Sequence, residues 1–463
     1  MSSANSLIVI GGGPAGYVAA IRASQLGIKT RLVEREDLGG ICLNWGCIPT
    51  KTLLHAGDVL AQLRTANDLG IIVPEGIRAD LPRVVQRSRE VATRLRQGVQ
   101  HLLKKHGVEV IKGQARLQGA GTLEVEGKNA QTLQADAILI ATGARPRALD
   151  SLPVDGDRLW NYRHALTPPA QPDSLLVVGA GAIGMEFASF YAELGSQVTV
   201  VETQARVLPV EDEETSQWVA RAFEARGIEI HTHTSAHLQT LDAQAAHITL
   251  RTENKKEAIR AFDRVLVCAG VVGNSEDLGL ETTRVITRHG CIQVHDYGQT
   301  DEPGVYAAGD ICGAPMLAHK ASHEAIRCVE HLAGLTVPQQ ADHIPSCTYC
   351  HPQVASVGLT EARARERGRP ISVGRFPFHG NGKALAINRP EGFVKTIFDT
   401  QSGELLGAHL VGPDVTELLH GISLAQRLEA TEEDLMNHIF AHPTLSEAIG
   451  ESVLQAYGRA IHI

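Results

Sequence analysis

The strongest constraint on this fold is a glycine-rich motif that occurs twice with the same internal spacing. The pattern Gly-x-Gly-x-x-Gly runs from Gly11 to Gly16 and again from Gly179 to Gly184. An apolar strand pattern precedes each copy and a helical pattern follows it. A second strand pattern then ends at a glutamate, 23 residues after the first glycine. The sequence therefore predicts two βαβ units with parallel strands. The expected strand, helix and strand are Leu7–Ile10, Tyr17–Leu26 and Thr30–Val33 in the first unit, and Ser174–Val178, Met185–Leu194 and Gln197–Val201 in the second.

Both units have the residues that a dinucleotide site needs. In the first, Gly11 allows the tight turn, Gly13 lets a pyrophosphate approach the backbone, and Gly16 lets the helix pack on the sheet. The helix N-terminus would bind the phosphates, and Glu34 would accept hydrogen bonds from a ribose diol. The second unit repeats this set as Gly179, Gly181, Gly184 and Glu202. Two bound cofactors would allow electrons to pass from one to the other. The alternatives are a merely tight turn, or a second copy that is only a structural remnant.

The glutamate of the second unit bears on which nicotinamide cofactor would bind. A carboxylate at this strand end pairs with a free ribose 2′-hydroxyl and repels a 2′-phosphate. Glu202 therefore favours NAD over NADP. Arg206, four residues later, keeps NADP open because arginine commonly binds the 2′-phosphate.

Two of the eight cysteines, Cys42 and Cys47, lie close together directly after the first unit. A helical pattern begins near Cys42 and runs into residues 52–63, and the pKa of a thiol at a helix N-terminus is lowered. One such thiol can attack an external disulfide while the other resolves the mixed disulfide. This pattern predicts a redox pair. The alternatives are inert buried thiols, or a metal site completed by Cys347 and Cys350. The latter two have thioredoxin-type spacing, but their strand-like surroundings favour unreactive thiols.

Composition excludes several classes of protein. The chain has 463 residues, a net charge of −9 and a hydrophobic fraction of 43%, which suits about three globular domains. The negative charge argues against nucleic acid as a partner, and residues 84–105 are predicted to form a solvated helix. No apolar run reaches the ~18 residues of a membrane span. The first six residues are too short for a signal peptide, so we expect a cytoplasmic location.

The segment from His442 to Glu447 has the pattern His-Pro-Thr-x-x-Glu. A residue before proline is disfavoured in a helix, so His442 is expected in a loop. An apolar helical pattern over residues 445–461 places Glu447 in its first turn, where the carboxylate can orient the imidazole. Imidazole titrates nearest neutral pH, which suits a base that takes a proton from a dithiol. We therefore predict His442 as the base and Glu447 as its partner.

These motifs resemble those of the dimeric flavoprotein disulfide reductases, most closely the dihydrolipoamide dehydrogenases among them. The resemblance implies FAD in the first unit and NAD in the second. It implies that Asp310 holds the ribityl chain and that Lys51 lies near the flavin ring, paired with Glu186. Cys47 would be the flavin-side thiol and Cys42 the exchanging one. The matching blocks are Gly11–Gly16 with Glu34, Gly39–Lys51, Ala141–Gly143, Gly179–Glu186 with Glu202, Ala308–Asp310, Met316–His319 and His442–Glu447. The implied cofactor positions are Gly11, Gly13, Pro14, Gly16, Glu34, Gly40, Lys51, Ala115, Thr142, Gly143, Asp310, Met316, Leu317, Ala318, His319, Gly179, Gly181, Gly184, Glu186, Glu202, Ala236 and Gly270.

The activity that the resemblance implies is NAD-dependent oxidation of dihydrolipoamide through a Cys42–Cys47 disulfide. His442 would reach the disulfide of the other subunit of a homodimer. The expected partner is the lipoyl domain of a 2-oxo acid dehydrogenase or related complex, with no metal, nucleic acid or membrane. The alternatives are a glutathione-reductase-like enzyme, which Glu202 opposes, and a mainly structural subunit of such a complex. Phe440 departs from the family pattern, which commonly has a second histidine there.

The expected fold class is α/β, with two Rossmann-like dinucleotide-binding domains and a C-terminal α+β dimerisation domain. We place the FAD-binding domain at residues 1–147 and 271–342, the NAD-binding domain at 148–270, and the interface domain at 343–463.

Overall fold

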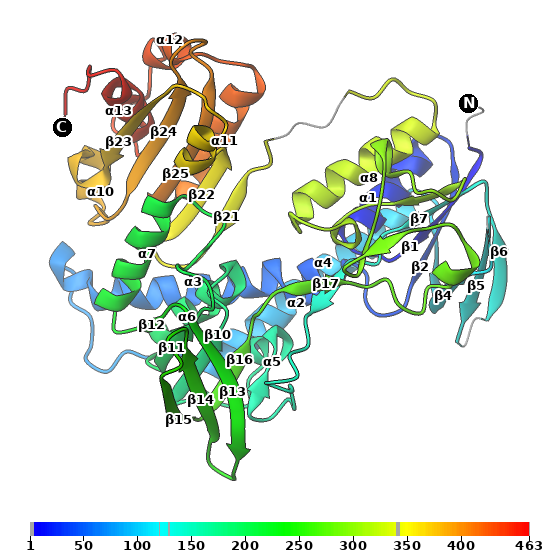
Figure 1. The fold of residues 1–463 in the computed structure, drawn as a ribbon, viewed down its shortest axis with the longest axis horizontal. Helices are drawn as coiled ribbons and strands as arrows, with labels where there is room; N and C mark the ends of the chain where they lie inside the picture. The colour runs from blue at the N-terminus through cyan, green and yellow to red at the C-terminus, as the bar shows by residue number, and fades with distance from the viewer. Residues whose placement is uncertain (1–3, 120, 128–129, 339–342, 463) are drawn as a thin grey trace. The chain divides into compact units, whose positions relative to one another are not determined.

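The computed structural model describes residues 4–119, 121–127, 130–338 and 343–462. Contacts divide the chain into two units (Figure 1). Unit 1 contains residues 1–52, 83–147 and 270–339, and unit 2 contains residues 53–82, 148–269 and 340–463. Each unit therefore joins segments that are far apart in the sequence.

Unit 1 is built on a parallel sheet of five short strands. These are β1 (Ser6–Ile10), β2 (Lys29–Glu34), β3 (Glu109–Lys112), β7 (Ala137–Ile140) and β20 (Val305–Ala307). Their order is β20-β7-β1-β2-β3, and every neighbouring pair is parallel. The central strands β1 and β7 are almost wholly buried, as expected when both faces of a parallel sheet are covered.

Helices cover one face of this sheet. α1 (Pro14–Gln25) and α8 (Ala318–Leu332) lie side by side, and α4 (Leu81–Lys105) packs into the same core (Figure 1). Alanines recur along the buried face of α1, so the helix can lie close to both the sheet and α8. Leu7 and Val9 of β1 point to this side.

The opposite face of the sheet packs against a small antiparallel sheet. Ile8 and Ile10 of β1 point to this side, because successive side chains of a strand alternate between faces. The antiparallel strands are β4 (Gln114–Leu117), β5 (Thr122–Glu126) and β6 (Gln131–Gln134). The remaining elements of unit 1 are the pair β8 (Ala144–Pro146) and β17 (Val271–Gly273), the pair β18 (Thr287–Arg288) and β19 (Cys291–Ile292), α2 (Gly40–Trp45), and the 3-10 helices η2 (Leu280–Thr282), η3 (Asp296–Gly298) and η4 (Asp310–Cys312).

Unit 2 contains a second parallel sheet built on the same plan. Its strands are β9 (Leu159–Trp160), β10 (Ser174–Val178), β11 (Gln197–Val201), β12 (Glu229–His231) and β16 (Arg264–Val267), in the order β12-β11-β10-β16-β9. β10, α6 (Ala182–Leu194) and β11 reproduce β1, α1 and β2. An antiparallel sheet again packs against it, made of β13 (Thr234–Leu241), β14 (Ala246–Thr252) and β15 (Glu257–Phe262). The helices α5 (Tyr162–Leu166) and α7 (Glu213–Ala225) complete this part.

The C-terminal part of unit 2 is an antiparallel sheet with helices packed against it. Its strands are β21 (Ser346–Thr348), β22 (Gln353–Gly358), β23 (Ile371–Pro377), β24 (Phe393–Asp399) and β25 (Leu405–Gly412), in the order β21-β22-β25-β24-β23. α11 (Val415–Arg427) and α13 (Glu447–Ala456) contribute to its core. The short helices of this part are α9 (Glu361–Glu366), η5 (Phe378–Gly380), α10 (Gly382–Ala386) and α12 (Glu432–Met436). Two further helices come from earlier in the chain: α3 (Cys47–Arg64) and the 3-10 helix η1 (Ala66–Leu69) that follows it.

The fold class predicted from the sequence is confirmed, and both βαβ units are present. Two helix predictions need correction. The single helical run from Cys42 is split into α2 and α3, because the chain leaves helical geometry at Gly46. The helix predicted over 445–461 is α13, which ends at Ala456 ahead of Gly458 with its φ of 67°. The three-domain division stays a prediction. Among the described residues, no helix has the length and apolar character that a membrane crossing requires.

Candidate functional site

Both glycine-rich turns bring two stretches of backbone into close contact. Gly11 and Gly179 each have a φ of 102°, a region that favours glycine. A Cβ on Gly16 would collide with the carbonyl oxygen of Gly11, and a Cβ on Gly184 would collide with that of Gly179. The sequence prediction that these positions need glycine therefore has a direct steric reason.

The residues before α1 and α6 leave the helix N-termini open to a phosphate. Gly13 and Gly181 are the N-cap residues, and a glycine has no side chain to bond the first amides. Pro14 follows as the first residue of α1, where proline is well tolerated. A Cβ on Gly40 would collide with Gly13, so the backbone is also close-packed here. Free amides at the start of a helix suit a pyrophosphate, and both turns therefore fit a dinucleotide.

Glu34 and Glu202 make equivalent hydrogen bonds in the two turns. Oε2 of Glu34 accepts from the amide of Gly12 at 2.6 Å, and Oε2 of Glu202 accepts from the amide of Ala180 at 2.8 Å. The second oxygen of each carboxylate accepts the amide two residues further along the chain, at 2.5 and 2.9 Å. Both carboxylates are buried at the ends of their strands, where a ribose diol would meet them.

Arg206 is the residue that made NADP an alternative to NAD in the sequence analysis. Its guanidinium donates to the carbonyl oxygen of Pro209 at 3.3 Å, within its own loop. This contact gives Arg206 a local role in shaping the loop.

Cys42 and Cys47 lie at the junction of two helices and are hydrogen-bonded to each other. The hydrogen bond with Cys47, burial, and the charge of Cys47 raise the pKa of the Cys42 thiol, while Lys51 acts in the opposite direction. The expectation of a lowered pKa is therefore wrong for Cys42. A negative charge on Cys47 opposes ionisation of Cys42.

Asp310 begins η4 and lies in a buried, charged environment. Burial raises its pKa, and the ammonium of Lys320 lowers it in part. Nζ of Lys320 lies 2.8 Å from Oε1 of Glu324, whose other oxygen accepts from the amide of Gly309 at 2.9 Å. The motif from Met316 to His319 leads into α8, with Leu317 at the N-cap and Ala318 as the first helical residue.

Thr142 and Asn274 join the two places where the chain leaves and re-enters unit 1. Oγ1 of Thr142 donates to the carbonyl oxygen of Asn274 at 2.9 Å, and Nδ2 of Asn274 returns a bond of 2.9 Å to the carbonyl oxygen of Thr142. The carbonyl of Gly143 accepts from the amide of Asn274 at 3.0 Å. Ala115 is buried in β4, and Gly270 has a φ of 94°.

Glu186 is buried in α6, and Oε1 accepts from the amide of Tyr349 at 3.0 Å. Ser189, one turn later, accepts from the amide of His351 at 3.0 Å. This face of α6 therefore holds the turn between β21 and β22 of the C-terminal sheet. Ala236 is buried in β13 of the same unit. The pairing of Glu186 with Lys51 stays a prediction.

Cys347 lies in β21, and Cys350 lies in the turn beyond it. The Cys350 thiol is 1% exposed and donates to the carbonyl oxygen of Pro352 at 3.2 Å, and burial raises its pKa. A thiol in this environment is unreactive. Cys347 is hydrogen-bonded to Tyr349. The described residues contain no group of three His, Cys, Asp or Glu side chains that could hold a metal ion.

His442 and Glu447 form the predicted pair in unit 2. Nδ1 of His442 lies 2.9 Å from Oε1 of Glu447, and Oε2 accepts from the amide of Thr444 at 2.8 Å. The imidazole is 80% exposed, so it is accessible to a partner molecule. Phe440 packs edge-on against His438, with ring centres 4.8 Å apart.

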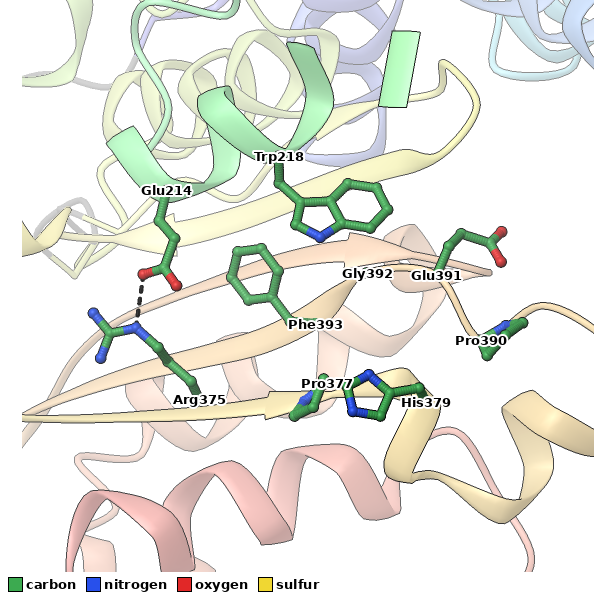
Figure 2. Close-up of a pocket in the computed structure, with 9 residues that line it drawn as sticks. All are labelled: Glu214, Trp218, Arg375, Pro377, His379, Pro390, Glu391, Gly392 and Phe393. Carbon is green, nitrogen blue, oxygen red and sulfur yellow. Dashed lines mark hydrogen bonds and ion pairs between the residues drawn. The ribbon is translucent and has the colours of Figure 1, made fainter. Parts of the chain in front are cut away.

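The structure also contains charged groups that sequence reasoning missed. Lys395 is 2% exposed and its ammonium lies 2.7 Å from Asp212 and 2.9 Å from Glu361. A lysine in β24, where apolar residues stand on both sides of Lys395 and Thr396, was the signal that could have found it. A pocket of about 320 Å³ lies beside this cluster. Trp218 and Phe393 point into it (Figure 2). The other residues lining it are Glu214, Arg375, Pro377, His379, Pro390, Glu391 and Gly392.

Comparison with known families accounts for most of the chain. Residues 5–325 match the pyridine nucleotide-disulphide oxidoreductase family, and residues 344–453 match the dimerisation domain of that family. The chain belongs to the pyridine nucleotide-disulphide oxidoreductases. The predicted resemblance to disulfide reductases is thus confirmed.

Relatives within the pyridine nucleotide-disulphide oxidoreductases match over the full length. A dihydrolipoyl dehydrogenase from Rhizobium etli is 49% identical, covering 100% of both chains, and one from Zymomonas mobilis is 50% identical, covering 98% of both. Among solved structures, LpdA from Mycobacterium tuberculosis superposes with a TM-score of 0.89 at 28% identity, covering 97% of this chain and 99% of its own. The HOCl-induced flavoprotein disulfide reductase RclA from Escherichia coli gives 0.85 at 26%, covering 97% and 99%.

Membership of the pyridine nucleotide-disulphide oxidoreductases confirms the prediction of an oxidoreductase that uses FAD and NAD. The match over residues 344–453 supports the predicted homodimer, since that segment is the dimerisation domain of the family. The roles of individual site residues stay predictions.

Proposed function

We propose that this chain catalyses the NAD-dependent oxidation of dihydrolipoamide to lipoamide. The observation that carries the proposal is the hydrogen-bonded pair of Cys42 and Cys47, because a dithiol substrate needs a dithiol–disulfide partner of unequal thiols. Relatives up to 50% identical over the full chain are dihydrolipoyl dehydrogenases, which supports the same substrate.

The thiol exchange runs in two steps. A substrate thiolate attacks Sγ of Cys42 in the oxidised pair, and the disulfide bond breaks with Cys47 leaving as the thiolate. The second substrate thiol then attacks the mixed disulfide, which releases Cys42 and closes the lipoamide ring. The raised pKa of Cys42 supports this division of roles, because the hydrogen bond with Cys47 and the charge of Cys47 oppose ionisation of the Cys42 thiol.

His442 takes the proton of the attacking substrate thiol. Glu447 holds Nδ1 of the imidazole, so Nε2 is the nitrogen that receives the proton. A positive charge that develops on the ring is stabilised by the adjacent carboxylate. We infer that His442 of one subunit serves the disulfide of the other, which fits an imidazole that is 80% exposed.

The first glycine-rich turn, with Glu34, Lys51 and Asp310, is proposed to hold FAD. The second turn, with Glu186 and Glu202, is proposed to hold NAD. FAD supplies a two-electron carrier between the protein dithiol and NAD. The chain's own contribution is to bind the two pyrophosphates at open helix N-termini and to orient the riboses through the two carboxylates.

The proposed partner is the lipoyl domain of a 2-oxo acid dehydrogenase or related complex, and the proposed location is the cytoplasm. A reducing compartment suits a chain whose cysteines include a reactive pair. We also keep the proposed division into an FAD-binding domain (1–147 and 271–342), an NAD-binding domain (148–270) and an interface domain (343–463).

The test is steady-state turnover of the FAD-loaded protein with two substrate pairs, dihydrolipoamide with NAD and glutathione disulfide with NADPH. We expect dihydrolipoamide with NAD to be fastest. Faster reduction of glutathione disulfide with NADPH would favour the glutathione-reductase-like alternative. A protein that binds FAD and lipoyl domain but turns over neither pair would be a structural subunit.

A further inference from the structure

A buried ammonium from the C-terminal sheet bonds the carboxylate at the start of α7. Nζ of Lys395 in β24 lies 2.7 Å from Oδ1 of Asp212, 2.9 Å from Glu361 and 3.1 Å from Glu214. The side chains of Lys395 and Asp212 are each 2% exposed. Two groups this deeply buried persist as ions only if their partners compensate the lost water.

Each carboxylate of this cluster is paired with at least one cation. Arg375 adds bonds of 2.7 Å to Glu214 and 2.9 Å to Glu361 (Figure 2 shows the first). Arg365 also lies 2.7 Å from Glu361, so the cluster has three carboxylates and three cations. Lys395 is the cation that bonds Asp212. Removing Lys395 would leave Asp212 as a buried anion without its ammonium, so Asp212 would have to move or take up a proton.

Asp212 in turn fixes the end of the loop between β11 and α7. Its Oδ1 accepts from the amide of Glu214 at 3.1 Å and caps α7, and its Oδ2 accepts from the amide of Glu361 at 3.1 Å. The position of Asp212 is thereby set from the C-terminal sheet as well as from its own helix.

The same loop rests on the second glycine-rich turn. The amide of Leu208 donates to the carbonyl oxygen of Ala180 at 2.8 Å. Leu208 is buried, has a φ of 43°, and its carbonyl accepts from Oγ of Ser216 in α7 at 3.1 Å. A leucine held at positive φ needs its surroundings to keep it there. Ala180 is also the residue whose amide Glu202 binds.

We propose that Lys395 is a positioning residue for NAD. It does not touch the cofactor. It anchors Asp212 and α7, these hold the loop of residues 203–212, and Leu208 holds the turn at Ala180 in the shape that accepts the pyrophosphate. The inference rests on the proposed assignment of NAD to this turn, and it makes the C-terminal sheet part of the NAD site's support.

The experiment measures NAD binding to the FAD-loaded dimer by isothermal titration calorimetry, without any dithiol substrate. For Lys395→Met we expect the dissociation constant to rise about 10-fold, within the range for residues that act on a site through packing. Reduction of the flavin by dihydrolipoamide, measured anaerobically without NAD, should keep its wild-type rate. The matched control is Arg369→Met, which removes a cation that pairs with Asp399 and Glu404 in the same sheet.

Two further variants cover the case in which Lys395→Met does not fold. Lys395→Arg keeps the positive charge but replaces a compact ammonium by a larger, planar guanidinium, and it should weaken NAD binding less than the ~10-fold expected for Lys395→Met. Ser216→Ala leaves the ion cluster intact and removes only the bond to Leu208, and it should weaken NAD binding by a smaller factor. The proposal is overturned if NAD binding is unchanged in folded Lys395→Met, or, where that variant does not fold, unchanged in Ser216→Ala. It is also overturned if flavin reduction and NAD binding fall together. A wild-type flavin that dihydrolipoamide does not reduce would instead contradict the proposed substrate and leave the NAD measurement valid.

Discussion

Nδ1 of His442 lies 2.9 Å from Oε1 of Glu447, and this contact decides which ring nitrogen can take a proton. The carboxylate is held from its other side by the amide of Thr444 at 2.8 Å. Burial alone would raise the pKa of Glu447, but the hydrogen bonds from Thr444 and His442 hold it below its ordinary value. The carboxylate therefore stays ionised, and the pair intact, down to acidic pH.

Replacing the base should affect the dithiol half of the reaction alone. We expect His442→Ala to lower turnover of dihydrolipoamide by ~10²–10⁴-fold, as for a lost general base. FAD content and electron transfer from NADH to a dye should be unchanged, since neither needs this proton transfer. Glu447→Gln should cause a smaller loss, and His420→Ala, an exposed histidine of the same unit, serves as the control. A dye reaction that fell equally would point to misfolding rather than to a lost base.

Mixed dimers test whether the base comes from the other subunit. Subunits with His442→Ala and subunits with Cys47→Ser should each be inactive alone. A mixed dimer has one site with an intact disulfide and an intact histidine, so it should recover about half the wild-type activity. Demonstrable heterodimers without activity would place the base in the same chain as its disulfide.

The two thiols should differ in their spectroscopic effect. Cys42→Ser should leave a Cys47 thiolate that gives long-wavelength absorbance with the flavin without prior reduction. Cys47→Ser should abolish that absorbance in the two-electron-reduced enzyme. The reason is the proposed division of roles, in which Cys47 is the flavin-side thiol and Cys42 is the exchanging one. Absorbance spectra of the two variants across pH decide the assignment, and the opposite result would exchange the roles.

The carboxylate of Glu202 should decide cofactor choice. In the double variant Glu202→Ser with Gln204→Arg, a 2′-phosphate would meet a cation where it now meets an anion. We expect the ratio of kcat/KM for NAD over NADP to fall by more than ~10-fold. The single variant Gln204→Arg is the control, because it adds the cation but keeps the carboxylate. A wild-type enzyme that already prefers NADP would contradict the prediction.

Asp58 and His351 should make opposite contributions to stability between pH 4 and 6. Nδ1 of His351 lies 3.9 Å from Oδ1 of Asp58. Burial raises the pKa of Asp58 to about 6 and lowers the pKa of His351 to about 4. In this range folding takes up a proton at Asp58 and releases one at His351, so the two effects on stability oppose each other.

Asp58→Asn should remove the contribution of Asp58 to the pH dependence of stability and leave that of His351. The unfolded state then binds more protons through His351, so the free energy of unfolding should rise with pH between about 4 and 6.5, by at most about 1.4 kcal/mol per pH unit. Thermal denaturation of the FAD-loaded protein from pH 4 to 7 measures this slope. The control is Asp68→Asn, at an exposed site. Equal slopes for Asp58→Asn and wild type would show that Asp58 has no such shift.

Several parts of this site were predictable because they depend on local backbone geometry. The two glycine-rich turns could be predicted from the spacing of their glycines. Where the strand turns into the helix, Gly16 packs so closely on the carbonyl oxygen of Gly11 that no side chain fits. The glutamate at the end of each second strand is likewise set by the length of one βαβ unit. The same holds for His442 and Glu447, five residues apart across a proline and the start of a helix.

Other features were decided only by the tertiary structure. Lys395 and Asp212 are 183 residues apart, and the sequence around either residue gives no indication that the two are in contact. Glu186 accepts a hydrogen bond from the backbone amide of Tyr349. Because every residue except proline has such an amide, the residue type at position 349 gives no indication of this contact. The helix pattern around Cys42 predicted a lowered pKa, but burial and the neighbouring thiol reversed it. Charges and thiols respond to the burial and the partners that packing supplies. Local spacing therefore determined where the site residues stand, and the packed fold determined their protonation and their partners.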